Sequence, residues 1–365
     1  MSEARSYEIE VAGTTDGGDR VPDLSPRDAL SRWLNKLRVS KRESTVSAYH
    51  YRLKHFIKFC EDEGIDSIRE VSGWDVETYE TARRERGLEP ITLNNELGTL
   101  KNFFEYCARI EVVDESLPER VVPPELETSD QVSDTRLHVD DARTLLEYYS
   151  NHEEVRGTRA HALLALAWYT GARLGALRGL DLGDYDRKEQ CVEFIHRPAQ
   201  GTPLKNGPDG ERIVGLPEEI CTVVDRYIRR YRHDVWDEFG RQSLLTSEIG
   251  RGSVNAVRTW MYLATVPCLH SACPHGKDPE TCEYLDYTQA SKCPSSRSPH
   301  PVRTGSITWQ LNRGIPPERV AERVNTSIEV LLRHYDQPSR MEEMRERRRP
   351  FLDRLTFDDE EGENG

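Results

Sequence analysis

Residues 298–335 read SPHPVRTGSITWQLNRGIPPERVAERVNTSIEVLLRHY, and they decide how the rest of the chain is interpreted. His300 and Arg303 are three residues apart, so on a helix both side chains would lie on one face. The stretch ends with Tyr335 in a His-Tyr-Asp triplet. Arginine holds phosphate oxygens with two donors, histidine transfers protons near neutral pH, and tyrosine can form a covalent intermediate. The stretch indicates phosphodiester chemistry, although His-x-x-Arg alone also fits an exposed helical pair.

The net charge of −14 is distributed unevenly over the 365 residues. Residues 1–28 contribute −4, residues 111–141 contribute −8 and residues 356–365 contribute −5. Because these segments together carry −17, the remainder carries +3, which is compatible with a local basic surface. The acidic total therefore does not exclude a nucleic-acid partner.

The composition also predicts the environment of the protein. Only nine of the 50 basic residues are lysine, and an acidic, lysine-poor chain resembles proteins of halophilic archaea. The mean hydropathy is −0.72, no run of 18 apolar residues occurs, and the acidic N-terminus lacks a signal-peptide pattern. We expect a soluble, cytoplasmic protein.

The first part of the chain predicts a small helical domain. Residues 1–24 are polar and rich in Gly and Asp, so we expect a disordered arm. A helical pattern begins after Ser25, a plausible N-cap, with Pro26 at the first helical position. Residues 25–116 contain four amphipathic segments, which are typical of an all-α domain.

The second part predicts a larger domain after a linker. Residues 117–136 are rich in Pro, Glu and Asp and predict an acidic linker. We assign residues 137–355 to the second domain and residues 356–365 to an acidic tail. The predicted fold class is mainly α with a small β-hairpin in the C-terminal domain (α+β).

The clearest β pattern lies in the middle of the second domain. Residues 191–195 and 212–216 alternate, with a further short run at 202–205 and the turn sequence Gly-Pro-Asp-Gly at 207–210. This pattern predicts a hairpin with Lys205 near its tip. Taken alone, Lys205 also fits a solvated turn lysine.

The eight cysteines divide into two groups of four. The first group lies on apolar faces or in the predicted strand, where we expect buried thiols: Cys60, Cys107, Cys191 and Cys221. The second group falls within 26 residues and includes two interleaved histidines, His270 and His275: Cys268, Cys273, Cys282 and Cys293. In a reducing cytoplasm such a cluster favours structural zinc over disulfides. We predict the four clustered cysteines as ligands, with either histidine as a substitute, and unligated thiols as the alternative.

Separated motifs then occur in a particular order. A Thr-Gly-Ala-Arg turn ends at Arg173, Lys205 lies on the predicted hairpin, and His300-x-x-Arg303 precedes Tyr335. This order resembles the tyrosine recombinase (phage integrase) family. Its members carry an Arg after a Thr-Gly-x turn, a Lys on a β-hairpin, a His-x-x-Arg motif and a nucleophilic Tyr about thirty residues later. The helical N-terminal domain also resembles the core-binding domain of that family.

The resemblance implies a role for each of these residues. Tyr335 would attack a DNA phosphate and form a 3′-phosphotyrosyl bond, which releases a 5′-hydroxyl. Arg173 and Arg303 would hold the nonbridging oxygens and stabilise the transition state. Lys205 would protonate the leaving oxygen as general acid, and His300 would support proton transfer.

The resemblance covers residues 24–355 and departs from the family pattern at two places. The family often has an acidic residue three positions after the first Arg, where Ala176 stands. It usually has a His or Trp about nine residues before the Tyr, where Asn325 and Thr326 stand. The cysteine-rich segment is a further addition.

We therefore expect a site-specific DNA recombinase that acts on double-stranded DNA as a dimer to tetramer. Structural zinc is the expected cofactor, and no nucleotide or catalytic metal is expected. One alternative is a zinc-containing DNA-binding protein of the same fold without strand cleavage. Another is a topoisomerase-like enzyme that nicks and reseals DNA with the same tyrosine chemistry.

Overall fold

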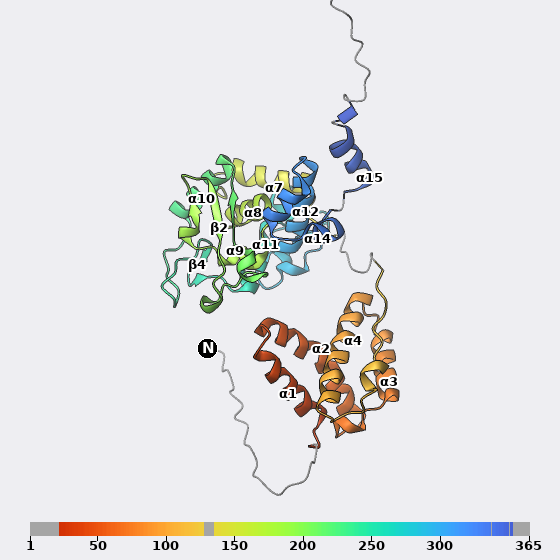
Figure 1. Ribbon diagram of the computed structural model, residues 1–365. Helices are drawn as coiled ribbons and strands as arrows, with labels where there is room; N and C mark the ends of the chain where they lie inside the picture. The colour runs from red at the N-terminus through yellow and green to blue at the C-terminus, as the bar shows by residue number, and fades with distance from the viewer. Residues whose placement is uncertain (1–21, 128–134, 337, 350, 353–365) are drawn as a thin grey trace, which may run out of the picture. The chain divides into compact units, whose positions relative to one another are not determined.

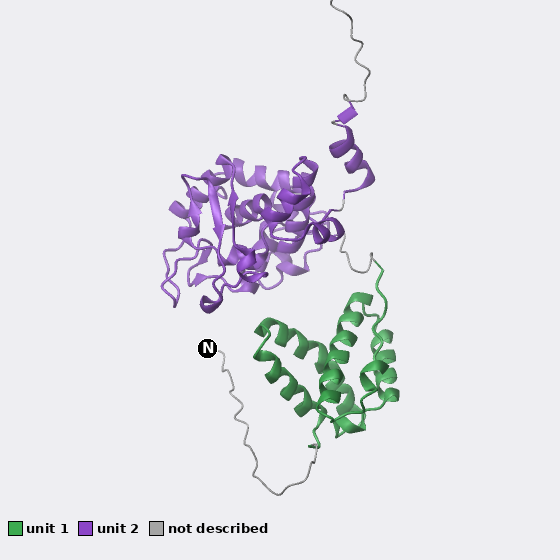
Figure 2. Ribbon diagram, viewed as in Figure 1, with its two compact units in different colours: residues 1–131 green, residues 132–365 purple. Residues whose placement is uncertain are grey.

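The computed structural model describes residues 22–127, 135–336, 338–349 and 351–352 (Figure 1). The chain divides into two compact units, residues 1–131 and residues 132–365 (Figure 2). Most of the predicted arm, the middle of the predicted linker and the predicted acidic tail lie outside the described residues.

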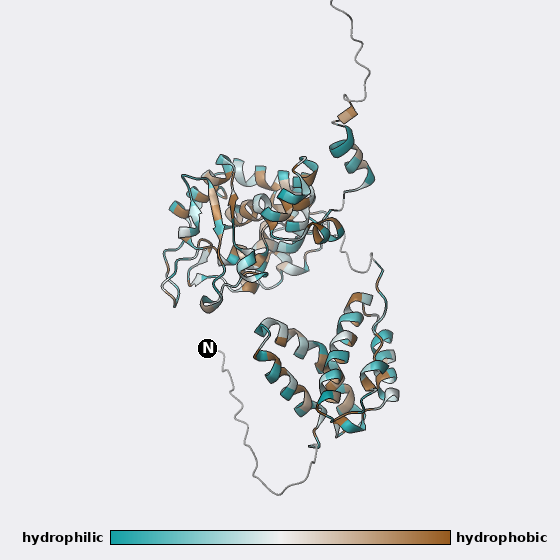
Figure 3. Cartoon of the chain, viewed as in Figure 1, coloured by the Kyte–Doolittle hydropathy of each residue, from teal (hydrophilic) through white to brown (hydrophobic). Residues whose placement is uncertain are grey.

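Unit 1 is a set of helices packed on an aromatic core. Its helices are α1 (Pro26–Arg38), α2 (Glu43–Asp62), α3 (Gly73–Glu85), α4 (Pro90–Arg109) and the short α5 (Leu117–Arg120), with a 3-10 turn at Ile68–Glu70. Helix α1 begins as predicted, because the Ser25 side chain accepts a hydrogen bond from the backbone N–H of Asp28. Phe56 of α2 meets Phe104 of α4 edge to face, with 5.4 Å between ring centroids. Each of these helices carries both hydrophobic and hydrophilic residues (Figure 3), as expected for the amphipathic segments that the sequence predicts.

Residues 117–121 differ from the predicted linker. They form α5 and the residue after it, and both Leu117 and Val121 are buried in the core of unit 1. The high Pro and Glu content of the surrounding sequence predicted a linker, although Leu117 and Val121 belong to the hydrophobic core. Unit 1 therefore extends further along the chain than the composition suggested.

A buried ion pair joins α3 to α4. Arg83 donates two hydrogen bonds to the Glu96 carboxylate, both at 2.8 Å. The two side chains are only 7% and 8% exposed. Each charge therefore depends on the other for its stabilisation, because water does not reach either of them freely.

Unit 2 is organised around α8 (Arg159–Thr170), an almost entirely buried helix. The other helices are α7 (Val139–Asn151), α9 (Leu174–Gly179), α10 (Glu218–Arg230), α11 (Val254–Ala264), α12 (Pro299–Asn312), α13 (Pro317–Val324), α14 (Ile328–His334) and α15 (Arg340–Glu342). Helices α10, α11 and α12 all pack against α8. This burial explains why apolar residues occupy most of the circumference of α8, with His161 and Thr170 as buried polar exceptions.

Glycine at position 305 lets α12 approach the start of unit 2 closely. A Cβ atom on Gly305 would lie 1.9 Å from the carbonyl oxygen of Leu137. Leu137 in turn donates its backbone N–H to the carbonyl of Pro301 at 3.0 Å. The helix that carries His300 and Arg303 is thus fixed to the first described residues of the unit.

The β-structure of unit 2 is small and antiparallel. One sheet has the order β1 (Tyr185–Asp186), β2 (Cys191–Phe194), β3 (Arg212–Gly215), and β4 (Thr246–Ser247) pairs with β5 (Gly250–Arg251). The predicted hairpin is present as β2 and β3, with Phe194 opposite Arg212. Residues 202–205 lie in the long β2–β3 loop instead of a strand. None of the described helices is both long and apolar enough to cross a membrane.

Candidate active site

The Thr-Gly-Ala-Arg turn places Arg173 at the start of α9. Gly171 ends α8 with φ 60°, a conformation that glycine adopts without strain. Its added Cβ would lie 2.7 Å from a methyl group of Val324, so the position also demands a small residue. The chain then reverses, and half-buried Arg173 donates a hydrogen bond to the carbonyl oxygen of Asn325 at 2.5 Å.

Arg303 is the most deeply buried cation of the site. It is 1% exposed, and its Nη1 donates to the carbonyls of Gly171 at 2.6 Å and Val324 at 2.7 Å. Its Nε and Nη2 make no hydrogen bond of good geometry among the described residues, and only the Tyr335 side chain lies close enough to raise the pKa of Arg303 by a weak hydrogen bond. Burial, followed by repulsion from Arg173, lowers the pKa of Arg303 to about 10. Two unused donors on a buried cation form a site suited to an anion.

Tyr335 lies directly beside this arginine. It follows the last residue of α14, is 6% exposed, and packs in a small apolar cluster that includes Leu331. The guanidinium carbon of Arg303 is 5.0 Å from the centre of its ring. Thr308 of α12 donates a hydrogen bond to the backbone carbonyl of Tyr335 at 2.8 Å. Helix α12 therefore holds the end of α14 against the arginine.

His300 lies on α12 one turn before Arg303 and completes this part of the site. Its ring lies edge to face with Tyr335, with 5.7 Å between centroids. His300 is exposed, but the protein around the ring removes part of its hydration. This desolvation, followed by repulsion from Arg303 and Arg173, lowers the pKa of His300. A neutral imidazole at neutral pH can accept a proton beside the tyrosine.

Lys205 is exposed in the β2–β3 loop, and no ion pair or hydrogen bond of its ammonium group occurs among the described residues. The next residue, Asn206, donates its side-chain N–H to the Asn325 side chain at 2.7 Å. Asn325 is also the acceptor for Arg173. The structure thus brings four of the five predicted residues together and places the loop of Lys205 against them.

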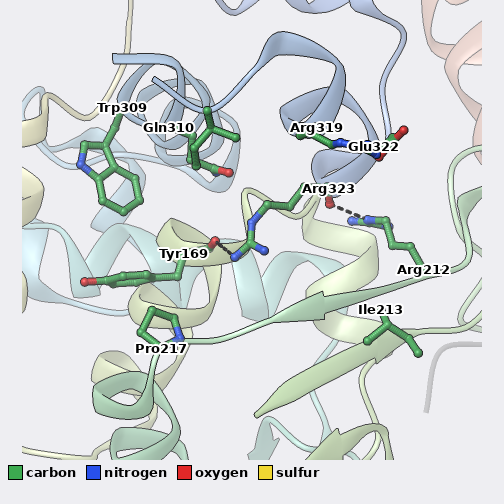
Figure 4. A pocket seen from close by; sticks show the side chains of 10 residues that line it. Tyr169, Arg212, Ile213, Pro217, Trp309, Gln310, Arg319, Glu322 and Arg323 are labelled. Atoms are coloured by element: carbon green, nitrogen blue, oxygen red, sulfur yellow. Dashed lines mark hydrogen bonds and ion pairs between the residues drawn. The ribbon is translucent and has the colours of Figure 1, made fainter. Parts of the chain in front are cut away.

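Sequence reasoning missed Arg212, which extends the cluster of cations. The Arg212 guanidinium lies over the Phe194 ring at 4.4 Å, and its Nε donates to the carbonyl of Arg323 at 2.7 Å (Figure 4). Burial and repulsion from Arg303 and Arg173 lower the pKa of Arg212 to about 9. The only sequence signal was an arginine opening an otherwise alternating strand.

The four arginines at positions 173, 212, 303 and 323 form no ion pair with any described carboxylate. Arg323 instead donates to the carbonyl of Tyr169 at 2.9 Å (Figure 4) and to the carbonyl of Gly215 at 2.8 Å. Such a concentration of uncompensated positive charge favours a strongly anionic ligand, and phosphate fits both the charge and the donors.

The two departures from the family pattern have different surroundings. Ala176 is buried in the core of unit 2, where an acidic side chain would have to be desolvated. Asn325 is half-buried and adopts φ 53° at the end of α13. It contacts both Arg173 and the Lys205 loop, so this position is part of the site.

The four clustered cysteines lie in a segment of turns and 3-10 helices before α12. Each is partly exposed and unpaired: Cys268, Cys273, Cys282 and Cys293. The Nε2 of His275 shares a hydrogen bond with Ser295 at 2.9 Å. Within the described part of the chain, no three Cys, His, Asp or Glu side chains are placed to hold one metal ion. Burial and then the neighbouring Cys273, Cys293 and Cys282 raise the pKa of Cys268, so the four thiols lie near one another, and the zinc site stays a prediction.

Comparison with known proteins agrees with this geometry. Residues 30–110 match the family described as phage integrase, N-terminal SAM-like domain. Tyrosine recombinase XerC of Bacillus pumilus is 29% identical over 166 residues, which is 45% of this chain and 53% of XerC. Tyrosine recombinase XerD of Mycobacterium leprae is 26% identical over 204 residues, 53% of this chain and 60% of XerD. The chain therefore spans just over half the length of these relatives.

Solved structures define the fold. The Tn1549 transposon integrase, in complex with a circular intermediate DNA, has a TM-score of 0.62 at 17% identity and covers 91% of this chain and 100% of that chain. A λ integrase dimer bound to a COC′ core site has a TM-score of 0.60 at 11% identity, covering 87% of this chain and 78% of that chain.

The chain has the fold of the Tn1549 and λ integrases. The predicted fold class is confirmed. The match to the phage integrase N-terminal SAM-like domain lies within unit 1. These relatives are named as recombinases or integrases, and nothing in them supports the alternative of a zinc-containing DNA-binding protein.

Proposed function

We propose that this protein is a site-specific DNA recombinase that cuts and rejoins DNA through a covalent bond to Tyr335. The observation that carries the proposal is the buried Arg303 guanidinium, which keeps two donors unused beside the tyrosine. An arginine in this state has stronger interactions to gain from a phosphate than from its present neighbours. The similarity to XerC, XerD and the integrases supports the same conclusion.

The reaction begins with attack of the Tyr335 phenolic oxygen on a DNA phosphorus. The phenolic proton passes to His300 or to water, and a new bond forms between the tyrosine oxygen and phosphorus. Arg303 and Arg173 stabilise the negative charge that develops on the nonbridging oxygens. The bond from phosphorus to the 5′-oxygen breaks, and that oxygen takes a proton from Lys205.

Rejoining is the same sequence in reverse. A 5′-hydroxyl from the same or another duplex attacks the phosphotyrosyl bond, and the phenolic oxygen of Tyr335 leaves and regains a proton. The phosphotyrosyl bond retains the energy of the original phosphodiester. The proposed chemistry therefore uses neither a nucleotide cosubstrate nor a catalytic metal.

We propose duplex DNA as the partner, with two to four copies of the chain assembled on it. Residues 25–116 and residues 137–355 would contact the duplex as two parts of a clamp. The Tn1549 integrase in complex with DNA and the λ integrase dimer on its core site support a DNA partner and more than one copy of the chain. From the composition we further propose that the protein works in the cytoplasm of an organism with high internal salt.

The experiment that tests the proposal is covalent trapping on nicked duplexes taken from around the gene. A nick just beyond the cleaved bond lets the short fragment that carries the new 5′-hydroxyl diffuse away, so the phosphotyrosyl adduct accumulates. We expect wild-type protein to give an adduct that survives denaturation and Tyr335→Phe to give none. Tyr287→Phe is the matched control, because this tyrosine is exposed and lies outside the site.

An adduct that persists in Tyr335→Phe would refute the assigned nucleophile. Specific binding of these duplexes without any adduct would favour a DNA-binding protein without cleavage. Adduct formation without strand exchange between two duplexes would favour a nicking and resealing enzyme.

A further inference from the structure

The loop that carries Lys205 is folded around one side chain of the opposite segment, Asn325. At one end of the loop, Asn206 donates a hydrogen bond to the Asn325 Oδ1 at 2.7 Å. At the other end, a Cβ added to Gly210 would lie 2.7 Å from the Asn325 Nδ2. The Asn325 amide therefore lies between Asn206 and Gly210, and a side chain at position 210 would have to displace it.

The backbone of Asn325 performs a second task in the same place. Its φ of 53° is the left-handed conformation, which asparagine tolerates better than most residues. This conformation ends α13, and the Asn325 carbonyl oxygen accepts the hydrogen bond from Arg173. Asn325 thus contacts Arg173, which would bind the phosphate, through its main chain, and contacts the β2–β3 loop that carries Lys205 through its side chain.

Arg212 attaches the same loop to the same segment independently. Its Nε donates to the carbonyl of Arg323, two residues before Asn325, and its Nη1 donates to the carbonyl of Gly210 at 2.9 Å. Arg212 therefore fixes the end of the loop, whereas Asn206 fixes the residue next to Lys205. Between residues 203 and 211 the described loop has no strand pairing, and on the other side of Lys205 the backbone N–H of Leu204 donates to the Nδ1 of His196 at 2.9 Å.

We propose that Asn325 is a positioning residue for Lys205: its amide seats the β2–β3 loop so that the lysine reaches the leaving 5′-oxygen. This inference rests on the proposed recombinase function, in which Lys205 is the general acid. Because Asn325 also accepts a hydrogen bond from Arg173, the position of Lys205 is linked to the position of an arginine that would bind the phosphate. A displacement of about 1 Å at a reacting group can reduce a rate about 100-fold.

The test compares two leaving groups in single-turnover cleavage. One duplex has the ordinary 5′-oxygen at the cleaved bond, and the other has sulfur there. A thiol has a pKa of about 8.5 and leaves without help from an acid, whereas an alkoxide needs a proton. A defect in the general acid is therefore suppressed by sulfur, and a defect in phosphate binding or in the fold is not.

We expect Asn206→Ala and Asn325→Gly to slow cleavage of the oxygen duplex by about 10- to 100-fold. Glycine keeps the left-handed backbone at position 325 and removes only the amide. With the sulfur duplex both variants should come within about threefold of wild type, as should Lys205→Ala. The double variant Lys205→Ala with Asn206→Ala should be no slower than Lys205→Ala alone, because both changes remove the same function.

Asp209→Asn is the matched control in the same loop, because this side chain is exposed. It should cleave both duplexes like wild type, and thermal unfolding should show that every variant is folded. Equal slowing of both duplexes in Asn206→Ala and Asn325→Gly would overturn the positioning role, as would additive losses in the double variant. A wild-type protein that cleaves neither duplex would instead refute the recombinase function, and the inference would fall with it.

Discussion

Replacing Arg303 by methionine tests whether the buried guanidinium is held ready for a phosphate. The change keeps a side chain of similar length and removes the charge and all donors. Two buried carbonyls, of Gly171 and Val324, lose their partner, at a cost of about 1–3 kcal/mol each. Removal of an uncompensated buried charge offsets much of this cost. We therefore expect the free energy of unfolding to change by no more than about 2 kcal/mol.

Cleavage should respond far more strongly than stability. Loss of one donor to a developing oxyanion typically lowers a rate about 100- to 1,000-fold, and Arg303 has two unused donors, Nε and Nη2. We expect single-turnover adduct formation to fall at least about 1,000-fold in Arg303→Met. Arg313→Met, at an exposed position just after the same helix, should remain within about twofold of wild type.

A second measurement separates anion binding from chemistry. Sulfate should raise the unfolding temperature of wild type more than that of Arg303→Met at matched ionic strength, because only wild type offers the two free donors. Adduct formation within tenfold of wild type in a folded Arg303→Met variant would refute the reasoning. An equal response of both proteins to sulfate would refute the anion site.

Further predictions concern the folded chain. Burial and then Arg156 lower the pKa of His161 to about 4. The unfolded state therefore binds more protons between pH 4 and about 6.5, and the free energy of unfolding falls as the pH is lowered through this range. His161→Gln should make the free energy of unfolding, measured by urea titration, depend less on pH in this range. Glu96→Gln should cost about 3–5 kcal/mol in the same titrations by leaving Arg83 charged and buried, whereas replacing both by methionine should cost less. Gly305→Ala should unfold or strongly destabilise unit 2, whereas Gly98→Ala, with open space around it in α4, should stabilise the helix by about 0.5–1 kcal/mol, and thermal melts distinguish the two. For the cysteine cluster, the sequence predicts one zinc ion per chain, so metal analysis of the native protein should give one equivalent of zinc that is lost after serine replacement of the four cysteines.

Local patterns in the sequence predicted the helices and the order of the site motifs. Ser25 and Pro26 start α1 as expected because capping depends on residues only a few positions apart. The hairpin strands were predicted because alternation is also a local property. Composition misled only where a few apolar side chains decided the outcome, as at Leu117.

Only the tertiary structure decided how the site is held together. Arg173 and Asn325 are 152 positions apart, and Arg212 and Arg323 are 111 positions apart, and no periodicity connects them. The depth of Arg303, the place of Asn325 and the cation cluster all depend on such contacts. Hydrogen bonds to backbone carbonyls carry no signature in the partner's residue type. The sequence by itself therefore determined which chemical groups are present, and the folded chain determined which of them meet.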